Sequence, residues 1–184
     1  DGQPGGQVCA AMTDLLDGLV LDLFRAALDD VSPAAAGDED DLPIALVGHA
    51  GYGRRDAAPY SDVDLMLLYS PKAKSLAESL ARRLTQDICD ASMQLGFSLR
   101  TTSDAISLAL RDAKTFTSLT ESRRLAGGVE LFEKYCDKLR RGTRRRRHAM
   151  LAFAEEARRD ERRQYTETIY LLEPNVKRSR GGLR

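Results

Sequence analysis

A chain of 184 residues with 42% hydrophobic content is large enough for one domain, or for a domain with a helical appendage. Its 28 basic and 28 acidic residues cancel, which argues against a protein that coats nucleic acid or anionic lipid by bulk charge. The three cysteines form no CxxC pair, and no apolar run reaches the length of a membrane span. We therefore expect a cytoplasmic protein that has no disulfide framework and does not bind a membrane.

The N-terminal part predicts one long helix, because apolar residues recur at helical spacing over 8–31. A polar linker with Pro and Gly follows over 32–41. Two short buried strands, at 44–47 and 65–69, flank a glycine-containing turn as in a hairpin. The later elements are, in order, a helix over 75–95, a strand over 97–101, a helix from a cap at 102–104 to about 112, a helix over 115–125, and a charge-rich helical region from 129 to about 165 that is interrupted near Gly142.

This order of elements predicts an α+β fold, with a small mixed sheet that carries helices on one face and is followed by helices only. We expect an N-terminal helix and linker over 1–41, a core over 42–128 and a helical region over 129–184. Because the last four residues, over 181–184, resemble the middle of a motif, we expect the chain to be a piece of a longer protein.

Two acids, Asp62 and Asp64, stand at the start of the second predicted strand. Side chains at i and i+2 of a strand share a face, with Cα atoms about 7 Å apart, so the two carboxylates would lie side by side while Val63 faces the core. Like charges so placed repel unless a cation intervenes. Oxygen ligands of this kind suit Mg²⁺, and two such ions can hold the attacking and leaving oxygens of a phosphoryl displacement.

The preceding loop supplies groups that suit phosphate. Gly51 and Gly53 flank Tyr52 and allow backbone N–H groups to approach an anion closely. Arg54 adds a planar cationic fork, and Ser61 adds a hydroxyl beside the acids. A lone Asp-x-Asp is usually a solvated strand start and a lone Gly-x-Gly is usually a turn, but the two together indicate a site for a nucleoside triphosphate and its metal.

Two separated segments resemble one family. The runs over 51–54 (GYGR) and 59–65 (PYSDVDL) resemble the nucleotidyltransferases of the DNA polymerase β type, and among them the PII uridylyltransferase family. The runs over 173–177 (EPNVK) and 181–184 (GGLR) resemble a later segment of that same family. The resemblance covers roughly 43–184, and two distant motifs make chance a poor explanation.

The resemblance implies a polymerase β-like core plus a C-terminal helical domain, and transfer of UMP from UTP to a tyrosine of the PII signalling protein with release of pyrophosphate. It implies that Asp62 and Asp64 are catalytic and bind two Mg²⁺ ions. The residues that it implies for nucleotide and phosphate binding are Gly51, Gly53, Arg54, Ser61 and, as weaker candidates, Arg100 and Lys177. The uridylyl-removing activity of the family needs a His-Asp motif, and the two histidines of this chain form none.

The sequence departs from the family pattern at several positions. Ala50 and Arg55 stand where the family commonly has glycine, and 178–180 (RSR) replaces a Glu-Gly-Pro segment. The third carboxylate that many members of the superfamily carry is not evident, because the strand expected around Gly96 to Thr101 contains no acid.

Other residues have simpler explanations. His49 beside the glycine turn is more often structural than catalytic, Asp56 is a turn acid, and Asp104 is a helix cap that could also replace the missing acid. The basic run 138–147 is by default a solvated helix face, since it lacks interleaved aromatics for base stacking. Two alternatives stay open: a nucleotidyltransferase that acts on RNA 3′ ends, and a catalytically silent nucleotide-sensing module of the same fold.

Overall fold

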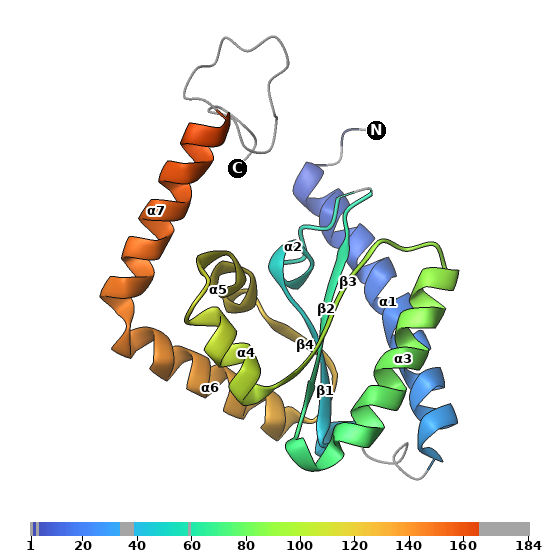
Figure 1. Ribbon diagram of the computed structural model, residues 1–184. Helices are drawn as coiled ribbons and strands as arrows, with labels where there is room; N and C mark the ends of the chain where they lie inside the picture. Colours follow the sequence, from blue (N-terminus) through green and yellow to red (C-terminus); the bar gives the residue numbers. More distant parts are fainter. Residues whose placement is uncertain (1, 3, 34–38, 59, 166–184) are drawn as a thin grey trace.

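A four-stranded mixed sheet with strand order β3-β2-β1-β4 lies at the centre of the computed structural model, which describes residues 2, 4–33, 39–58 and 60–165 (Figure 1). The elements are α1 (Gly5–Val31), η2 (Glu39–Asp41), β1 (Ile44–Gly48), α2 (Ala50–Gly53), β2 (Val63–Tyr69), η3 (Pro71–Ala73), α3 (Lys74–Asp90), β3 (Leu95–Thr101), α4 (Thr102–Ala109), α5 (Ala113–Thr120), β4 (Arg123–Gly127), α6 (Val129–Arg145) and α7 (Arg147–Tyr165). The α+β class and the small mixed sheet are confirmed.

The hairpin predicted from the two apolar runs is β1 and β2, which pair antiparallel with Gly48 opposite Leu65. β4 pairs antiparallel with the other edge of β1, and β3 pairs parallel with β2. The parallel pair is possible because α3 carries the chain back to the end of the sheet at which β2 begins.

Helices cover both faces of the sheet, so the prediction of helices on one face is wrong. α1 and α3 lie on one side and α4, α5 and α6 on the other (Figure 1). Every residue of β1 is buried, with Leu46 facing the first group of helices and Val47 the second. The continuous apolar runs of β1 and β2 are typical of strands buried on both faces, whereas a half-exposed strand would alternate with polar residues.

The fourth strand, β4, occupies part of the segment for which the sequence predicts a helix over 115–125, so the prediction of a helix is wrong there. α5 ends at Thr120, and the segment from Arg123 to Gly127 joins the sheet. Gly127 has φ 79°, and a Cβ there would lie 2.3 Å from the carbonyl oxygen of Ile44. Long-range contacts, rather than local propensity, therefore determine this strand.

The boundaries of the other elements differ by a few residues from those predicted. α3 ends at Asp90, so Leu95 belongs to β3, and α4 ends at Ala109 rather than near Asp112. The break between the last two helices lies at Arg146, while Gly142 continues α6, where a Cβ would lie 3.0 Å from Leu110 Cδ1.

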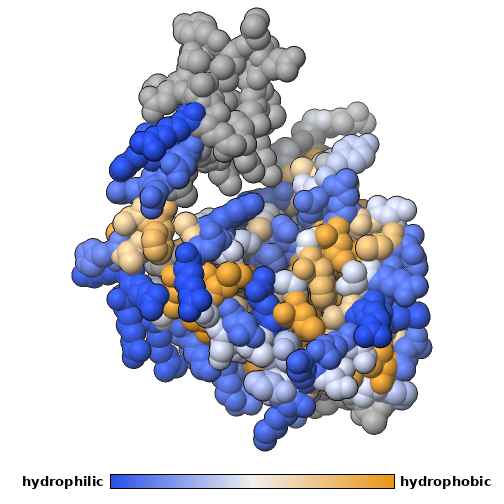
Figure 2. Space-filling view, in the orientation of Figure 1, coloured by the Kyte–Doolittle hydropathy of each residue, from blue (hydrophilic) through white to orange (hydrophobic). Residues whose placement is uncertain are grey.

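The surface seen in Figure 2 mixes hydrophilic side chains with several apolar groups, one of which lies over the first half of α7. Leu151 and Phe153 are exposed large apolar residues of this helix. Among the helices of the described ranges, none has the length and apolar character that crossing a membrane requires. The division into segments 1–41, 42–128 and 129–184 stays a prediction.

Candidate functional site

The acid pair lies at the end of the hairpin that the glycine turn closes. Asp64 belongs to β2 and is half-buried, whereas Asp62 is exposed one residue before the strand begins. The backbone N–H of His49, which follows β1, donates to the carbonyl oxygen of Asp64 at 3.0 Å. Val63 is buried against the α1 and α3 side, so strand alternation directs Asp64 toward the opposite face of the sheet.

The Asp64 carboxylate leans over the neighbouring strand. Gly96 of β3 is its register partner, and a Cβ built on Gly96 would lie 2.5 Å from Asp64 Oδ1. An acid at position 96 would therefore collide with this carboxylate, which is a physical reason for the glycine. Within the described ranges, no group of three or more His, Cys, Asp and Glu side chains is arranged to hold a metal.

The glycine turn forms the single helical turn α2, and its two glycines differ in role. The Gly53 N–H donates to the His49 carbonyl oxygen at 2.9 Å, and a Cβ on Gly53 would lie 2.0 Å from the carbonyl oxygen of Glu121. Gly53 is thus required for close packing against the loop before β4. A Cβ on Gly51 would meet only Arg54 Nη2, at 3.9 Å, so Gly51 borders open space.

Two residues at the ends of this turn, Ala50 and Arg55, have left-handed backbone conformations although they carry side chains. Ala50 has φ 53° and Arg55 has φ 66°. Glycine adopts this region without the steric cost that a Cβ imposes. Ala50 and Arg55 therefore carry the strain of a side chain in a left-handed conformation.

The polar candidates beside the acids already have protein partners. Arg54 Nε donates to Asp56 Oδ2 at 2.8 Å, in a pair whose side chains are 46% and 59% exposed. Ser61 Oγ accepts a hydrogen bond from the Ala58 N–H at 3.2 Å and so closes the loop before Asp62. Since exposed pairs of this kind contribute little, a phosphate could replace Asp56 as the partner of Arg54.

His49 has a partner that the sequence did not reveal. Its Nδ1 lies 2.7 Å from Ser118 Oγ of α5, 69 positions away, and the ring is half-buried. Burial lowers the pKa of His49; the charge of Asp64 opposes this shift, while the charge of Arg100 adds to it. Arg100 and Asp64 thus act on the same histidine, although Arg100 lies near the far end of β3.

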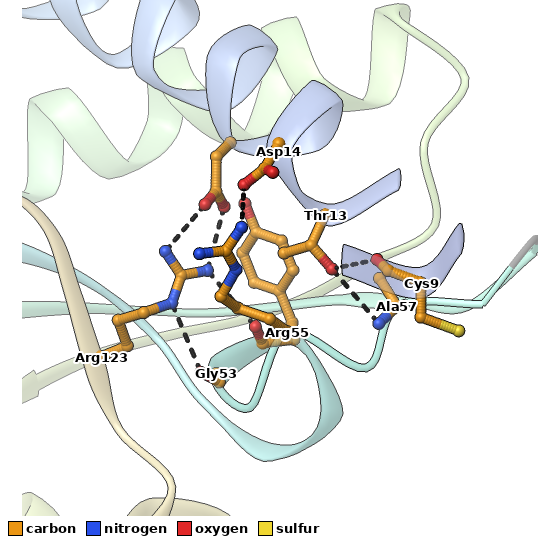
Figure 3. A network of polar contacts seen from close by, with 9 residues as sticks. Cys9, Thr13, Asp14, Gly53, Arg55, Ala57 and Arg123 are labelled. Carbon is orange, nitrogen blue, oxygen red and sulfur yellow. Dashed lines mark hydrogen bonds and ion pairs between the residues drawn. The ribbon is translucent and has the colours of Figure 1, made fainter. Parts of the chain in front are cut away.

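A set of contacts behind the turn joins residues that no sequence pattern connects. In Figure 3, Arg123 of β4 points toward α1 and toward the backbone of the glycine turn. It forms a two-pronged ion pair with Asp17 and donates to the carbonyl oxygen of Gly53 at 3.3 Å. Arg55 pairs with Asp14, and the N–H of Ala57 donates to Thr13 Oγ1 at 3.3 Å. α1 is therefore joined to the segment between β1 and β2.

The remaining candidates lie away from the acids. The N-cap of α4 is Thr101, one residue before the predicted cap at 102–104. Its Oγ1 accepts a hydrogen bond from the Asp104 N–H at 3.2 Å, and the Asp104 carboxylate accepts one from the Thr101 N–H at 3.4 Å, so Asp104 takes part in the cap from the third helical position. Thr101 and Gly96 are at opposite ends of β3, about 17 Å apart at the usual rise per residue. Pro59, Lys177 and the motifs over 173–177 and 181–184 lie outside the described residues.

A cavity of about 430 Å³ lies at the other end of the sheet. Residues of η2, of the start of α4 and of α6 line it, among them Asp41, Thr102 and Lys138. Tyr69, the last residue of β2, also lines it, so the length of the strand separates the cavity from the acid pair.

Paired carboxylates at the mouth of a sheet strand, beside a glycine turn, define a candidate nucleotide site. The family described as GlnD PII-uridylyltransferase matches residues 148–184. Three relatives, each named bifunctional uridylyltransferase/uridylyl-removing enzyme, align with most of this chain. They are from Burkholderia orbicola (36% identity over 80% of this chain and 17% of the relative), Aromatoleum aromaticum (38% over 77% and 16%) and Cereibacter sphaeroides (37% over 95% and 19%).

Most of the chain is thus similar to proteins named for uridylyl transfer, as the two sequence motifs predicted. The chain spans less than a fifth of the length of these three relatives, which are covered to 17%, 16% and 19%.

Proposed function

We propose that this chain carries the nucleotidyltransferase site of a Mg²⁺-dependent enzyme that transfers UMP from UTP to a tyrosine of the PII signalling protein and releases pyrophosphate. Its sheet would be a polymerase β-like core, and α6 and α7 would begin a helical domain. The observation that carries the proposal is the position of Asp62 and Asp64 at the mouth of β2, in a chain whose relatives are named for uridylyl transfer.

The side chains present fit a magnesium site. Mg²⁺ is commonly held by one or two carboxylates together with the phosphates of the substrate, so two acids suffice. Asp62 is exposed, and Asp64 Oδ1 lies above Gly96, a position without a side chain. Bound Mg²⁺ would neutralise the triphosphate and stabilise the departing pyrophosphate.

The other candidates would bind and orient the nucleotide. Gly51 borders open space, so its backbone can approach a phosphate closely. Arg54 would exchange its exposed pairing with Asp56 for the phosphates, and Ser61 would contribute its hydroxyl next to Asp62. Arg100 adds positive charge on the same face of the sheet as Asp64. Gly53 would shape the turn through its packing against Glu121.

The test is transfer of label from UTP labelled at the α-phosphate to purified PII protein, with the full-length protein as enzyme. Asp62→Asn and Asp64→Asn should each reduce the rate at least about 100-fold, because charge stabilisation at the reacting phosphate is lost. Asp30→Asn is the matched control, since Asp30 is an exposed acid of α1 that pairs with Arg83.

Equal rates in the wild type and both site variants would refute the role of the acid pair. Nucleotide binding without any transfer would favour the silent sensing module, and label transferred to RNA instead of PII would favour the RNA-directed alternative. The names of the three relatives support transfer of uridylyl groups.

A further inference from the structure

We propose that Arg123 is a positioning residue of the nucleotide site, which clamps the glycine turn onto α1 through Asp17. The inference rests on the proposed function for its kinetic consequence, although the clamp itself can be tested without nucleotide. Arg123 would not touch the substrate; it would act through the backbone of Tyr52 and Gly53.

Arg123 uses all of its guanidinium nitrogens in these contacts. Nη1 and Nη2 donate to the two carboxylate oxygens of Asp17 at 2.7 and 3.0 Å. Nε donates to the Gly53 carbonyl oxygen at 3.3 Å, and Nη2 lies 3.4 Å from the Tyr52 carbonyl oxygen. The guanidinium carbon is also 5.6 Å from the centroid of the Tyr52 ring, within the range of a cation–π contact.

The Arg123–Asp17 ion pair is less exposed to solvent than the Arg54–Asp56 pair beside the acids, so it can contribute more to the stability of the turn. The side chains of Arg123 and Asp17 are 28% and 16% exposed, compared with 46% and 59% for Arg54 and Asp56. A two-pronged, partly buried pair is stronger and more directional than an exposed one. Lysine could not make all the contacts of Arg123, because an ammonium group lacks the planar fork that reaches a carboxylate and two carbonyl groups together.

The turn needs support of this kind. α2 is a single helical turn, and one turn is not stable by itself. Left-handed conformations at Ala50 and Arg55 bracket it and add strain. Contacts from outside must therefore hold the turn in place, and Arg123 binds the two carbonyl groups at its C-terminal end.

Two further contacts tie the same segment to α1. Arg55 pairs with Asp14, and Thr13 Oγ1 accepts a hydrogen bond from the N–H of Ala57. All three attachments arise within two turns of one helix, on the side that faces the glycine turn (Figure 3). α1 is thus part of the support of the site, so a shift of α1 would be transmitted to Gly51 and Arg54.

The experiment compares Arg123→Met and Arg123→Lys with a control on the same strand. Arg124→Met removes a comparable set of contacts, to Asp40 at 2.9 Å and to the Gly127 carbonyl oxygen at 2.7 Å, at a place remote from the turn. Hydrogen exchange of residues 50–58 in the nucleotide-free, full-length protein is the first measurement, and KM and kcat for UTP are the second.

Arg123→Met should increase exchange over 50–58 at least about tenfold, while Arg124→Met leaves it unchanged. Arg123→Met should also raise KM for UTP about tenfold, with less than about a threefold change in kcat. For Arg123→Lys, both the exchange rate and KM should lie between those of Arg123→Met and wild type. Equal exchange in Arg123→Met and Arg124→Met would overturn the clamp, as would a loss of kcat at constant KM. If Arg123→Met does not fold, Arg123→Lys and Asp17→Asn provide the same comparison.

The two proposals fail in distinguishable ways. If the wild type does not transfer UMP, the proposed function is wrong, but the exchange of residues 50–58 still decides whether Arg123 and Asp17 hold the turn. If transfer occurs and exchange does not respond to Arg123→Met, only the clamp is wrong.

Discussion

Alanine at each of the two turn glycines should have opposite effects on stability. A Cβ on Gly53 would lie 2.0 Å from the carbonyl oxygen of Glu121 and 3.0 Å from that of Gly48. Both are backbone atoms that no side-chain rotation can move, so the cost belongs at the upper end of overpacking, about 3 kcal/mol. At Gly51 the new methyl group meets open space, and alanine in a helical turn gains about 0.5–1 kcal/mol over glycine.

Thermal unfolding of the 184-residue chain, followed by far-UV circular dichroism, measures the difference. For a chain of this size each kcal/mol shifts Tm by about 2–4 °C, so Gly53→Ala should melt about 6–12 °C below wild type. Gly51→Ala should melt at the wild-type temperature or a few degrees above it. A Gly53→Ala variant that melts within about 1 °C of wild type would refute the packing of the turn described here.

Three further predictions concern the same site. Ala50→Gly should raise the free energy of unfolding by up to about 1 kcal/mol in urea titrations, because it relieves the left-handed strain at φ 53°; a loss of stability would contradict this. Because burial lowers the pKa of His49, the unfolded chain takes up the proton first as pH falls, so the stability associated with a neutral His49 is complete above its ordinary pKa and declines below it. His49→Gln should flatten this decline in metal-free urea titrations below about pH 6.5, and an unchanged slope would contradict it. Gly96→Ala should displace the flexible Asp64 carboxylate, leave Tm nearly unchanged and reduce UMP transfer about tenfold or more, whereas full activity would separate Gly96 from the site.

The parts of the fold that local patterns determine were predictable from the sequence. The β1–β2 hairpin and the long first helix follow from apolar periodicity, and the start of α4 follows from its capping residues to within one residue of the observed N-cap, Thr101. The strand from Arg123 to Gly127 could not be found in this way, because its arginines are held by partners far along the chain.

The same limit applies to the site. The acid pair and the glycine turn lie within one short segment, and their chemistry is visible in the sequence. The bond from Arg123 to Asp17 spans 106 positions and that from His49 to Ser118 spans 69, and no spacing rule connects such residues. The acids and the glycine turn could therefore be identified from the sequence, whereas only the folded chain brings together the residues that are distant in sequence.

The most direct test of the account is whether UTP and Mg²⁺ stabilise the protein together and through Asp64. At about 100 times the dissociation constant, binding adds about 2.7 kcal/mol, which is a rise in Tm of roughly 5–11 °C. The account predicts this rise for wild type only when both UTP and Mg²⁺ are present, and its loss in Asp64→Asn. An equal rise in Asp64→Asn, or a rise with UTP that is indifferent to Mg²⁺, would contradict the claim that the acids at the mouth of β2 hold the metal and the triphosphate.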